Sequence, residues 1–161
     1  MSDGRIVMKM NSLVDPDVID ALYEAAETGT SIDLIVRGIC CLRAGVKGLS
    51  ETIRVRSIVG TFLEHSRIFR FGSDGRGPRY WIGSADLMPR NLGSRVECVA
   101  PVTSSELKAR LEEILLVNLA DDVLAWELGP TGWTKVPTKI GINAQMRLRE
   151  LAEERTLRVL Q

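Results

Sequence analysis

Two short apolar segments separated by a capped helix constrain the fold of this chain most. Residues 5–10 (RIVMKM) and 32–36 (IDLIV) are rich in β-branched and other apolar residues, which favours strands. Between them, Asp15 followed by Pro16 is typical of a helix start, and Gly29 is typical of a helix end. This spacing predicts a parallel strand pair joined by a right-handed crossover.

The rest of the chain predicts further strands and helices. Strands are expected at residues 53–58, 67–71, 79–84, 95–99 and 123–128, and helices at residues 59–64, 103–115 and 144–154. Thr103 and Glu106 form the pattern of a capping box at the start of the second of these helices. The alternation predicts an α/β fold in one domain over residues 1–161, with weaker signals over residues 122–161.

The charges are unevenly distributed, although they sum to zero. Residues 37–95 contain 11 basic and 4 acidic side chains, a net charge of +7, and the rest of the chain carries −7. Ten of the 11 basic residues are arginines, whose planar guanidinium groups bind phosphate or carboxylate oxygens in pairs. A basic centre in a neutral chain indicates an anionic ligand, although solvated arginine-rich strands would give the same pattern.

The cysteines argue against two classes of small protein. Cys40, Cys41 and Cys98 are an odd number and contain no CxxC pair, which argues against a disulfide framework and a zinc site. We expect Cys40 and Cys41 to pack in the protein. The sequence shows no secretion signal and no apolar stretch of about 18 residues. We therefore expect a reduced, cytoplasmic protein with at most peripheral membrane contact.

The single histidine, His65, lies within the basic segment. Imidazole is suited to proton transfer near neutral pH and can accept a phosphoryl group. Arg67 follows it, and Gly83-Ser84 comes later in the chain. A His-x-basic element followed by Gly-Ser resembles a half-site of the phospholipase D superfamily. Gly72 stands where that superfamily has an aspartate, which argues against phosphodiester hydrolysis.

A longer resemblance covers residues 5 to about 120. It is carried by the blocks 8–15 (MKMNSLVD), 33–42 (DLIVRGICCL), 53–60 (IRVRSIVG), 62–68 (FLEHSRI) and 82–86 (IGSAD), and more weakly by Asn143-Ala144-Gln145. These blocks are similar to the C-terminal catalytic domain of the type 1 polyphosphate kinases. The resemblance implies a phospholipase-D-like mixed sheet flanked by helices.

The resemblance also implies an activity, which is the reversible transfer of the terminal phosphate of ATP to polyphosphate through a phosphohistidine. That histidine and the magnesium-binding arginines belong to a preceding half of the family's active site, which these 161 residues do not resemble. We therefore expect little kinase activity from the chain alone. We expect Mg²⁺ to accompany ATP in the whole enzyme and to bind none of the residues identified here. The implied partners are ATP or ADP, polyphosphate, and the other half of the enzyme or further copies of this chain, but not nucleic acid.

Residue by residue, the resemblance implies that His65 is the catalytic residue, a proton donor or acceptor at the transferred group. It implies a nucleotide-phosphate contact for Arg37 and an active-site position for Arg95. From their charge, Arg67 and Arg90 are expected to line the path of polyphosphate. The central prediction is that Arg37, His65 and Arg95 meet in one anion-sized pocket.

Structural roles compete with these assignments. Arg67 could pair with Glu64, and Arg90 could cap a turn. We expect Asp86 and Ser84 to be structural, Asp86 as an orienting carboxylate and Ser84 as a turn residue.

Trp126 and Trp133 are expected in the core, although either could stack on a purine.

Two alternative functions fit the same residues. One alternative function is a non-catalytic polyphosphate- or nucleotide-binding module that does not need His65. The other is a homodimeric phospholipase-D-like phosphodiesterase in which two copies of His65 face one phosphate.

Overall fold

The predicted strand–helix–strand unit forms the N-terminal part of the fold. β1 (Arg5–Met10), α1 (Pro16–Glu27) and β2 (Ser31–Val36) follow one another, and the two strands pair in parallel. The side chain of Asp15 caps the helix, and Gly29 beyond its end has a φ of 86°, a conformation that favours glycine. The start and stop signals in the sequence are therefore confirmed.

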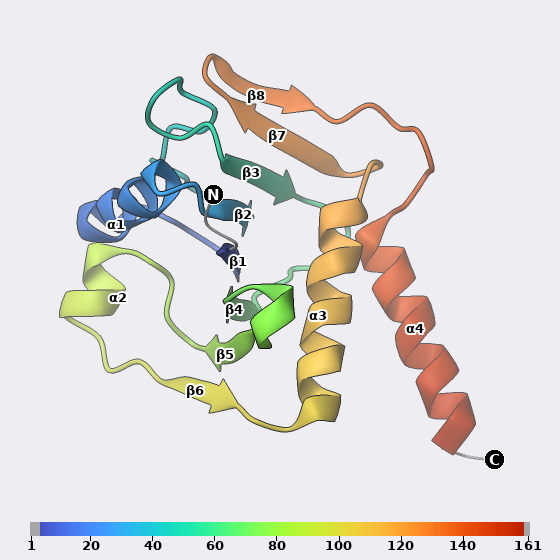
Figure 1. Cartoon of the computed structure of the whole chain (residues 1–161). Helices are drawn as coiled ribbons and strands as arrows, with labels where there is room; N and C mark the ends of the chain where they lie inside the picture. The colour runs from blue at the N-terminus through green and yellow to red at the C-terminus, as the bar shows by residue number, and fades with distance from the viewer. Residues whose placement is uncertain (1–3, 160–161) are drawn as a thin grey trace.

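The computed structural model describes residues 4–159, which form one eight-stranded sheet with helices on both faces (Figure 1). The strand order is β6-β5-β4-β1-β2-β3-β7-β8. The remaining strands are β3 (Ile53–Ile58), β4 (Arg67–Phe71), β5 (Arg79–Gly83), β6 (Val99–Val102), β7 (Ala125–Gly129) and β8 (Gly132–Lys135). β1, β2 and β3 are parallel and all others pair antiparallel, so the predicted α/β class with a mixed sheet is confirmed.

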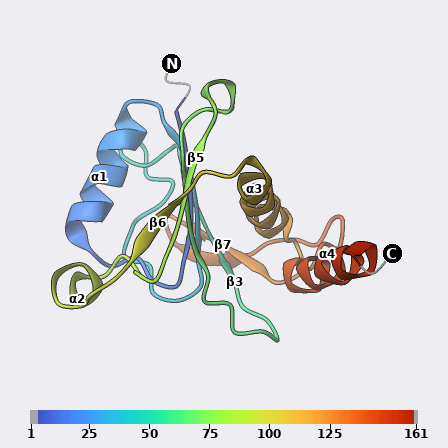
Figure 2. The ribbon, with the colours of Figure 1, turned by 90° about the horizontal axis from the view of Figure 1, so that it is seen from below.

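The helices cover the two faces in pairs (Figure 2). α1 and α2 (Pro89–Gly93) lie on one side of the sheet, and α3 (Ser105–Ala120) and α4 (Ala144–Val159) lie on the other. Under α1, Leu22 packs with Leu34 in one buried apolar cluster, and under α3, Leu115 packs with Val7 and Ile35 in another. Successive strand residues point to opposite faces, so each central strand contributes to both clusters.

One edge of this sheet collects the loops that carry the predicted site residues. The parallel strands end at this edge, β4 begins there beside the end of β1, and the end of β5 lies beside the starts of β4 and β6. We call the loops at residues 11–15, 37–41, 59–66, 84–88 and 95–98 the site edge. In sheets with parallel strands, ligands bind beyond the carboxyl ends of those strands.

Two sequence predictions at the site edge are wrong. Residues 59–64 form an irregular loop rather than a helix, because both backbone groups of Phe62 bond to the side chain of Gln145. The strand expected at 95–99 instead covers Val99–Val102. Val96 is fully exposed, so the alternating pattern there has no core to cover.

Further corrections concern the C-terminal half. The cap of α3 is Ser104 rather than Thr103, and the loop expected after residue 128 contains the unpredicted strand β8. Trp126 and Trp133 lie on the β7–β8 hairpin and are 44% and 38% exposed, so their expected place in the core is wrong. Lys135 covers Trp126 at 5.9 Å from the ring centre. A hairpin at the outer end of a sheet has few neighbours to bury its aromatic residues.

Candidate functional site

A buried carboxylate organises the site edge. Asp86 is 4% exposed, and its Oδ1 accepts hydrogen bonds from the N–H groups of Asn11 (2.8 Å) and Ser12 (3.2 Å). Its Oδ2 accepts one from Arg67 Nη2 at 2.8 Å. Burial raises the pKa of Asp86, but the hydrogen bonds from Arg67, Asn11 and Ser12 outweigh burial and bring the pKa below its ordinary value. Asp86 therefore stays charged and joins the end of β1 to the start of β4.

Arg67 extends this network to the imidazole of His65. Arg67 Nη1 lies 3.0 Å from His65 Nδ1 and also donates to the His65 carbonyl oxygen at 2.8 Å. A guanidinium N–H can only donate, so Nδ1 is the acceptor and the neutral ring carries its hydrogen on Nε2. The ring is exposed at the site edge. Arg67 thus orients the imidazole, and it pairs with Asp86 instead of the suggested Glu64.

Arg37 lies directly after β2 and faces the loop that follows β1. Its Nε donates to Asn11 Oδ1 at 2.7 Å. The two loops approach closely, since Gly38 N–H donates to the Asn11 carbonyl oxygen at 2.7 Å and a Cβ on Gly38 would lie 3.0 Å from that oxygen. Within residues 4–159 no other group bonds to the Arg37 guanidinium, which leaves both Nη groups available to an anion.

The far side of the site edge carries a second polar cluster. Ser84 Oγ donates to Glu97, and Asn91 Nδ2 donates to Glu97 Oε1 at 2.6 Å. The hydrogen bonds from Ser84 and Asn91 lower the pKa of Glu97 below its usual value, and the charges of Arg95 and Arg67 add to the effect. Ser84 is occupied as a hydrogen-bond donor, in keeping with the turn role expected of it.

The predicted site residues thus occupy one edge of the sheet. Arg37 and His65 are linked through Asn11, Asp86 and Arg67 by successive hydrogen bonds. The sequence predicts no role for Asn11. Its position directly after the first strand, where ligands bind in such sheets, could have indicated one.

Two predicted cations lie on the Glu97 side of this edge. Arg95 is exposed and acts on Glu97 through its charge. Arg90 is exposed on α2, the helix that also supplies Asn91. Glu97, for which the sequence predicts no role, lies two residues after Arg95. The convergence of Arg37, His65 and Arg95 on one anion, and the polyphosphate path along Arg67 and Arg90, stay predictions.

Large apolar side chains are exposed around this polar network. They come from three loops of the site edge and are Ile39, Val59, Phe62, Leu63 and Val96. Large apolar side chains exposed near polar groups are found on surfaces that contact another protein segment.

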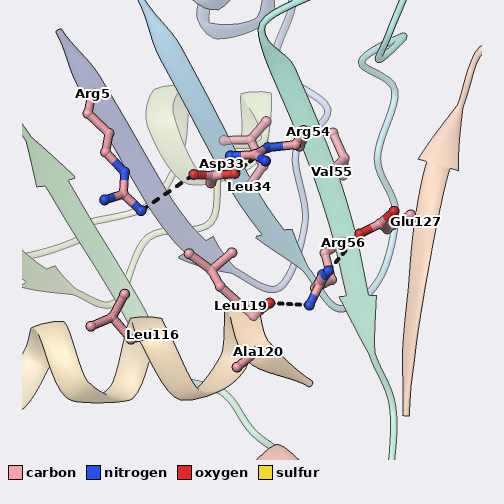
Figure 3. Close-up of a pocket in the computed structure, with 10 residues that line it drawn as sticks. All are labelled: Arg5, Asp33, Leu34, Arg54, Val55, Arg56, Leu116, Leu119, Ala120 and Glu127. Carbon is pink, nitrogen blue, oxygen red and sulfur yellow. Dashed lines mark hydrogen bonds and ion pairs between the residues drawn. The ribbon is translucent and has the colours of Figure 1, made fainter. Parts of the chain in front are cut away.

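Other arginines of the basic segment lie away from the site edge. A cavity of about 330 Å³ lies on the α3 face of the sheet, and Figure 3 shows the side chains that line it. There Arg54 pairs with Asp33 (2.9 Å), and Arg56 pairs with Glu127 (2.6 Å) and donates to the backbone of α3. These arginines are matched by neighbouring carboxylates, so the +7 charge of residues 37–95 is not concentrated at one place.

The described residues contain neither a metal-ligand cluster nor a membrane-spanning helix. In residues 4–159, no three His, Cys, Asp or Glu side chains lie together as ligands for a metal ion. Over the same range, no helix has the length and apolar character needed to cross a membrane. Cys40 is partly buried beside the apolar cluster, whereas Cys41 is exposed, so its expected packing is wrong.

Comparison with known families then decides the assignment. Residues 1–147 match the family described as polyphosphate kinase C-terminal domain 2. The chain belongs to this family. It is 54% identical over 136 residues to polyphosphate kinase 1 of Chlorobaculum tepidum, and the aligned residues cover 84% of this chain and 19% of that protein. It is 60% identical over 129 residues to a polyphosphate kinase of Synechocystis, and the aligned residues cover 80% of this chain and 18% of that protein.

Solved structures agree with the polyphosphate kinase assignment. The crystal structure of polyphosphate kinase from Porphyromonas gingivalis matches with a TM-score of 0.89 and 37% identity, over 94% of this chain and 24% of that one. A phospholipase D family member from Salmonella typhimurium matches with a TM-score of 0.52 and 17% identity, over 71% of this chain and 77% of that one. The second likeness shows the fold alone, and it confirms the predicted phospholipase-D-like sheet. The chain spans about a fifth of the length of the two curated polyphosphate kinases described above.

Proposed function

We propose that this chain forms one part of the active site of a polyphosphate kinase that reversibly transfers the terminal phosphate of ATP to polyphosphate. The observation that carries this proposal is the hydrogen-bonded series Arg37–Asn11–Asp86–Arg67–His65 beyond the ends of the parallel strands. It presents a guanidinium with two available Nη groups and an exposed imidazole in a chain of the polyphosphate kinase family.

The chemistry of phosphoryl transfer suits these groups. In the forward direction the bond between the γ-phosphorus and the β,γ-bridging oxygen of ATP breaks and ADP leaves with that oxygen. The phosphoryl group passes, by way of the histidine that belongs to the other half of the active site, to a terminal oxygen of polyphosphate. Enzymes accelerate such transfers mainly by positioning and charge stabilisation. Arg37 and Arg95 would bind non-bridging oxygens, and His65 would donate from Nε2 to a phosphate oxygen. Arg67 would act by orienting His65.

The site edge is proposed to be completed by a further part of the enzyme. Three of its loops expose large apolar side chains, and these 161 residues match only about a fifth of the polyphosphate kinases to which they are similar. The isolated chain would then bind ATP or polyphosphate weakly and transfer little phosphate. In this proposal Mg²⁺ is present only because it is bound to ATP.

A chimera tests the proposal. The matching segment of the Chlorobaculum tepidum enzyme is replaced by this chain, and polyphosphate formation is measured from radiolabelled ATP. We expect an active chimera and an almost inactive isolated chain. His65→Ala in the chimera should lower the rate by about 10²- to 10⁴-fold, the usual contribution of an acid–base group.

Arg149→Gln is the matched control, because Arg149 is exposed on α4 and pairs only with Glu153 among the described residues. A folded chimera that binds polyphosphate but transfers no phosphate would favour the binding-module function. Normal activity of His65→Ala, or kinase activity of the isolated chain at the rate of the chimera, would contradict the proposed site.

A further inference from the structure

The loop that carries His65 has no secondary structure of its own. Residues 59–66 run from the end of β3 to the start of β4 and contain no helix or strand. Several of their side chains, including Phe62 and Leu63, are exposed. Such a loop is expected to sample several conformations unless other parts of the fold restrain its backbone.

One side chain from α4 supplies that restraint. Gln145 is the second residue of α4 and is 4% exposed. Its Oε1 accepts a hydrogen bond from Phe62 N–H at 2.9 Å, and its Nε2 donates to the Phe62 carbonyl oxygen at 2.8 Å. One carboxamide therefore binds both backbone groups of a residue in the middle of the loop, as a neighbouring strand would.

The loop fits closely around this carboxamide. A Cβ on Gly60 would lie 2.5 Å from Gln145 Oε1 and 2.7 Å from Leu124 Cδ1, which is closer than side-chain carbons approach such atoms. Glycine at this position therefore permits the contact.

The start of α4 is itself fixed. Ala144 is fully buried, and its N–H donates to Asp121 Oδ2 at 2.7 Å. The other carboxylate oxygen of Asp121 accepts from the N–H groups of residues 123–125 at 2.7–3.1 Å. Gln145 thus projects from a backbone that is tied to the start of β7.

Two residues separate the clamped Phe62 from His65. The end of the loop that contains His65 is held by an ion pair at 2.9 Å between Glu64 and the buried Lys9, and by the hydrogen bond from Arg67 to the imidazole. We propose that Gln145 is a positioning residue, which acts through Phe62 to place the imidazole of His65 at the site edge. The catalytic part of this inference rests on the proposed function, but the structural part does not.

The structural part is tested on the 161-residue chain. Gln145→Met keeps the length and apolar stem of the side chain but can neither donate to nor accept from Phe62 as an amide does. We expect hydrogen exchange of the Phe62 amide to accelerate by about tenfold or more. The ring ¹⁵N signals of His65 should shift, and they need no assignment because the chain has one histidine. Arg149→Gln should change neither signal.

Gly60→Ala tests the same contact from the loop side and leaves α4 intact, so the inference can still be tested if Gln145→Met does not fold. It should also accelerate Phe62 exchange and shift the His65 signals. Unchanged Phe62 exchange and unchanged His65 signals in a folded variant would overturn the inference.

The catalytic part is tested in the chimera. We expect Gln145→Met to lower kcat by about 10- to 100-fold, as small misplacements of catalytic groups do, and to leave KM for ATP within about twofold. KM is expected to stay because Arg37 lies outside the loop. Accelerated exchange with a kcat within twofold of the parent would overturn the positioning role. An inactive parent chimera would instead refute the proposed function, and the Phe62 and His65 signals would still decide whether the clamp exists.

Discussion

The N-terminal strand–helix–strand unit and the C-terminal segment 121–159 are held in place by different kinds of contact. In the N-terminal unit, Leu22, Leu34 and Val36 belong to one buried apolar cluster between α1 and the sheet. In the C-terminal segment, two adjacent carboxylates accept hydrogen bonds from backbone N–H groups. Asp121 binds residues 123–125 and 144, and Asp122 binds four consecutive residues, 139–142.

This difference matters for the site because each region carries one part of it. Arg37 is placed by the parallel strands, so apolar packing determines its position. The loop of His65 is placed by Gln145, whose own position depends on Asp121. Changes in one region should therefore affect stability and site geometry differently from changes in the other.

The largest effect is expected from Leu34→Ala in the apolar region. Leu34 is fully buried in β2, and the substitution leaves a cavity beneath α1. The free energy of unfolding should fall by about 3–5 kcal/mol, measured by urea denaturation. Leu157→Ala, at an exposed position of α4, is the control and should change it by less than about 0.5 kcal/mol. A cost below 1 kcal/mol for Leu34→Ala would contradict the assignment of this cluster as the core.

The next effect is expected from Asp121→Ala in the polar region. The substitution leaves part-buried N–H groups at residues 123 and 124, and buried ones at residues 125 and 144, without their acceptor. We expect a loss of about 2–3 kcal/mol in the free energy of unfolding. Hydrogen exchange should increase more at the start of α4 and in the loop at residues 59–66 than in β1 or β2. Equal acceleration in all strands would show that the two regions are not separately anchored.

The same difference explains how much could be predicted from the sequence. Apolar periodicity and the Asp15-Pro16 start signal located β1, α1 and β2 within a residue or two, because packing against a core imposes a period on the sequence. The polar anchors impose none. Asp121 and Asp122 bind backbone groups up to 23 and 20 residues away, and Gln145 binds one 83 residues away, so no apolar period marks them. Gln145 stands out in the sequence only as part of a weak block of family resemblance. His65, Arg37 and the parallel strands indicate the candidate site from the sequence, and Asp86 is expected there as an orienting carboxylate. Its hydrogen bonds to Arg67 and Asn11 needed the structure.

A smaller effect, confined to acid, is expected at Asp122. Backbone hydrogen bonds from Ile140 and Lys139, with further ones from Gly141 and Ile142, lower the pKa of Asp122 to about 2. An unfolded aspartate has a pKa near 4, so between about pH 4 and pH 2 the unfolded chain binds the proton more tightly. The stabilisation is present above this range and is lost as the pH falls through it. Asp122→Asn should flatten this part of the stability–pH curve, whereas Asp20→Asn on the exposed face of α1 should leave it unchanged. An unchanged curve in Asp122→Asn would show that the carboxylate is not held in this way.

The smallest effect is expected at Tyr80, where both kinds of contact meet in one side chain. Its ring belongs to the apolar cluster under α3, and its hydroxyl donates to Glu112 Oε2 at 2.6 Å. Tyr80→Phe removes the polar contact and keeps the ring. Because Arg70 still pairs with Glu112, the free energy of unfolding should fall by only about 1 kcal/mol at neutral pH.

Alkaline pH separates the two contributions of Tyr80 further. Burial, with the hydrogen bond to Glu112, raises the pKa of Tyr80 to about 12. An unfolded tyrosine ionises near pH 10, so between about pH 10 and pH 12 the folded chain holds the proton more tightly and stability falls as the pH rises. This fall should be smaller in Tyr80→Phe, measured by urea denaturation at several pH values. An equal fall in both proteins would mean that the hydroxyl is not held by the fold, and that Tyr80, like the N-terminal unit, contributes mainly through apolar packing.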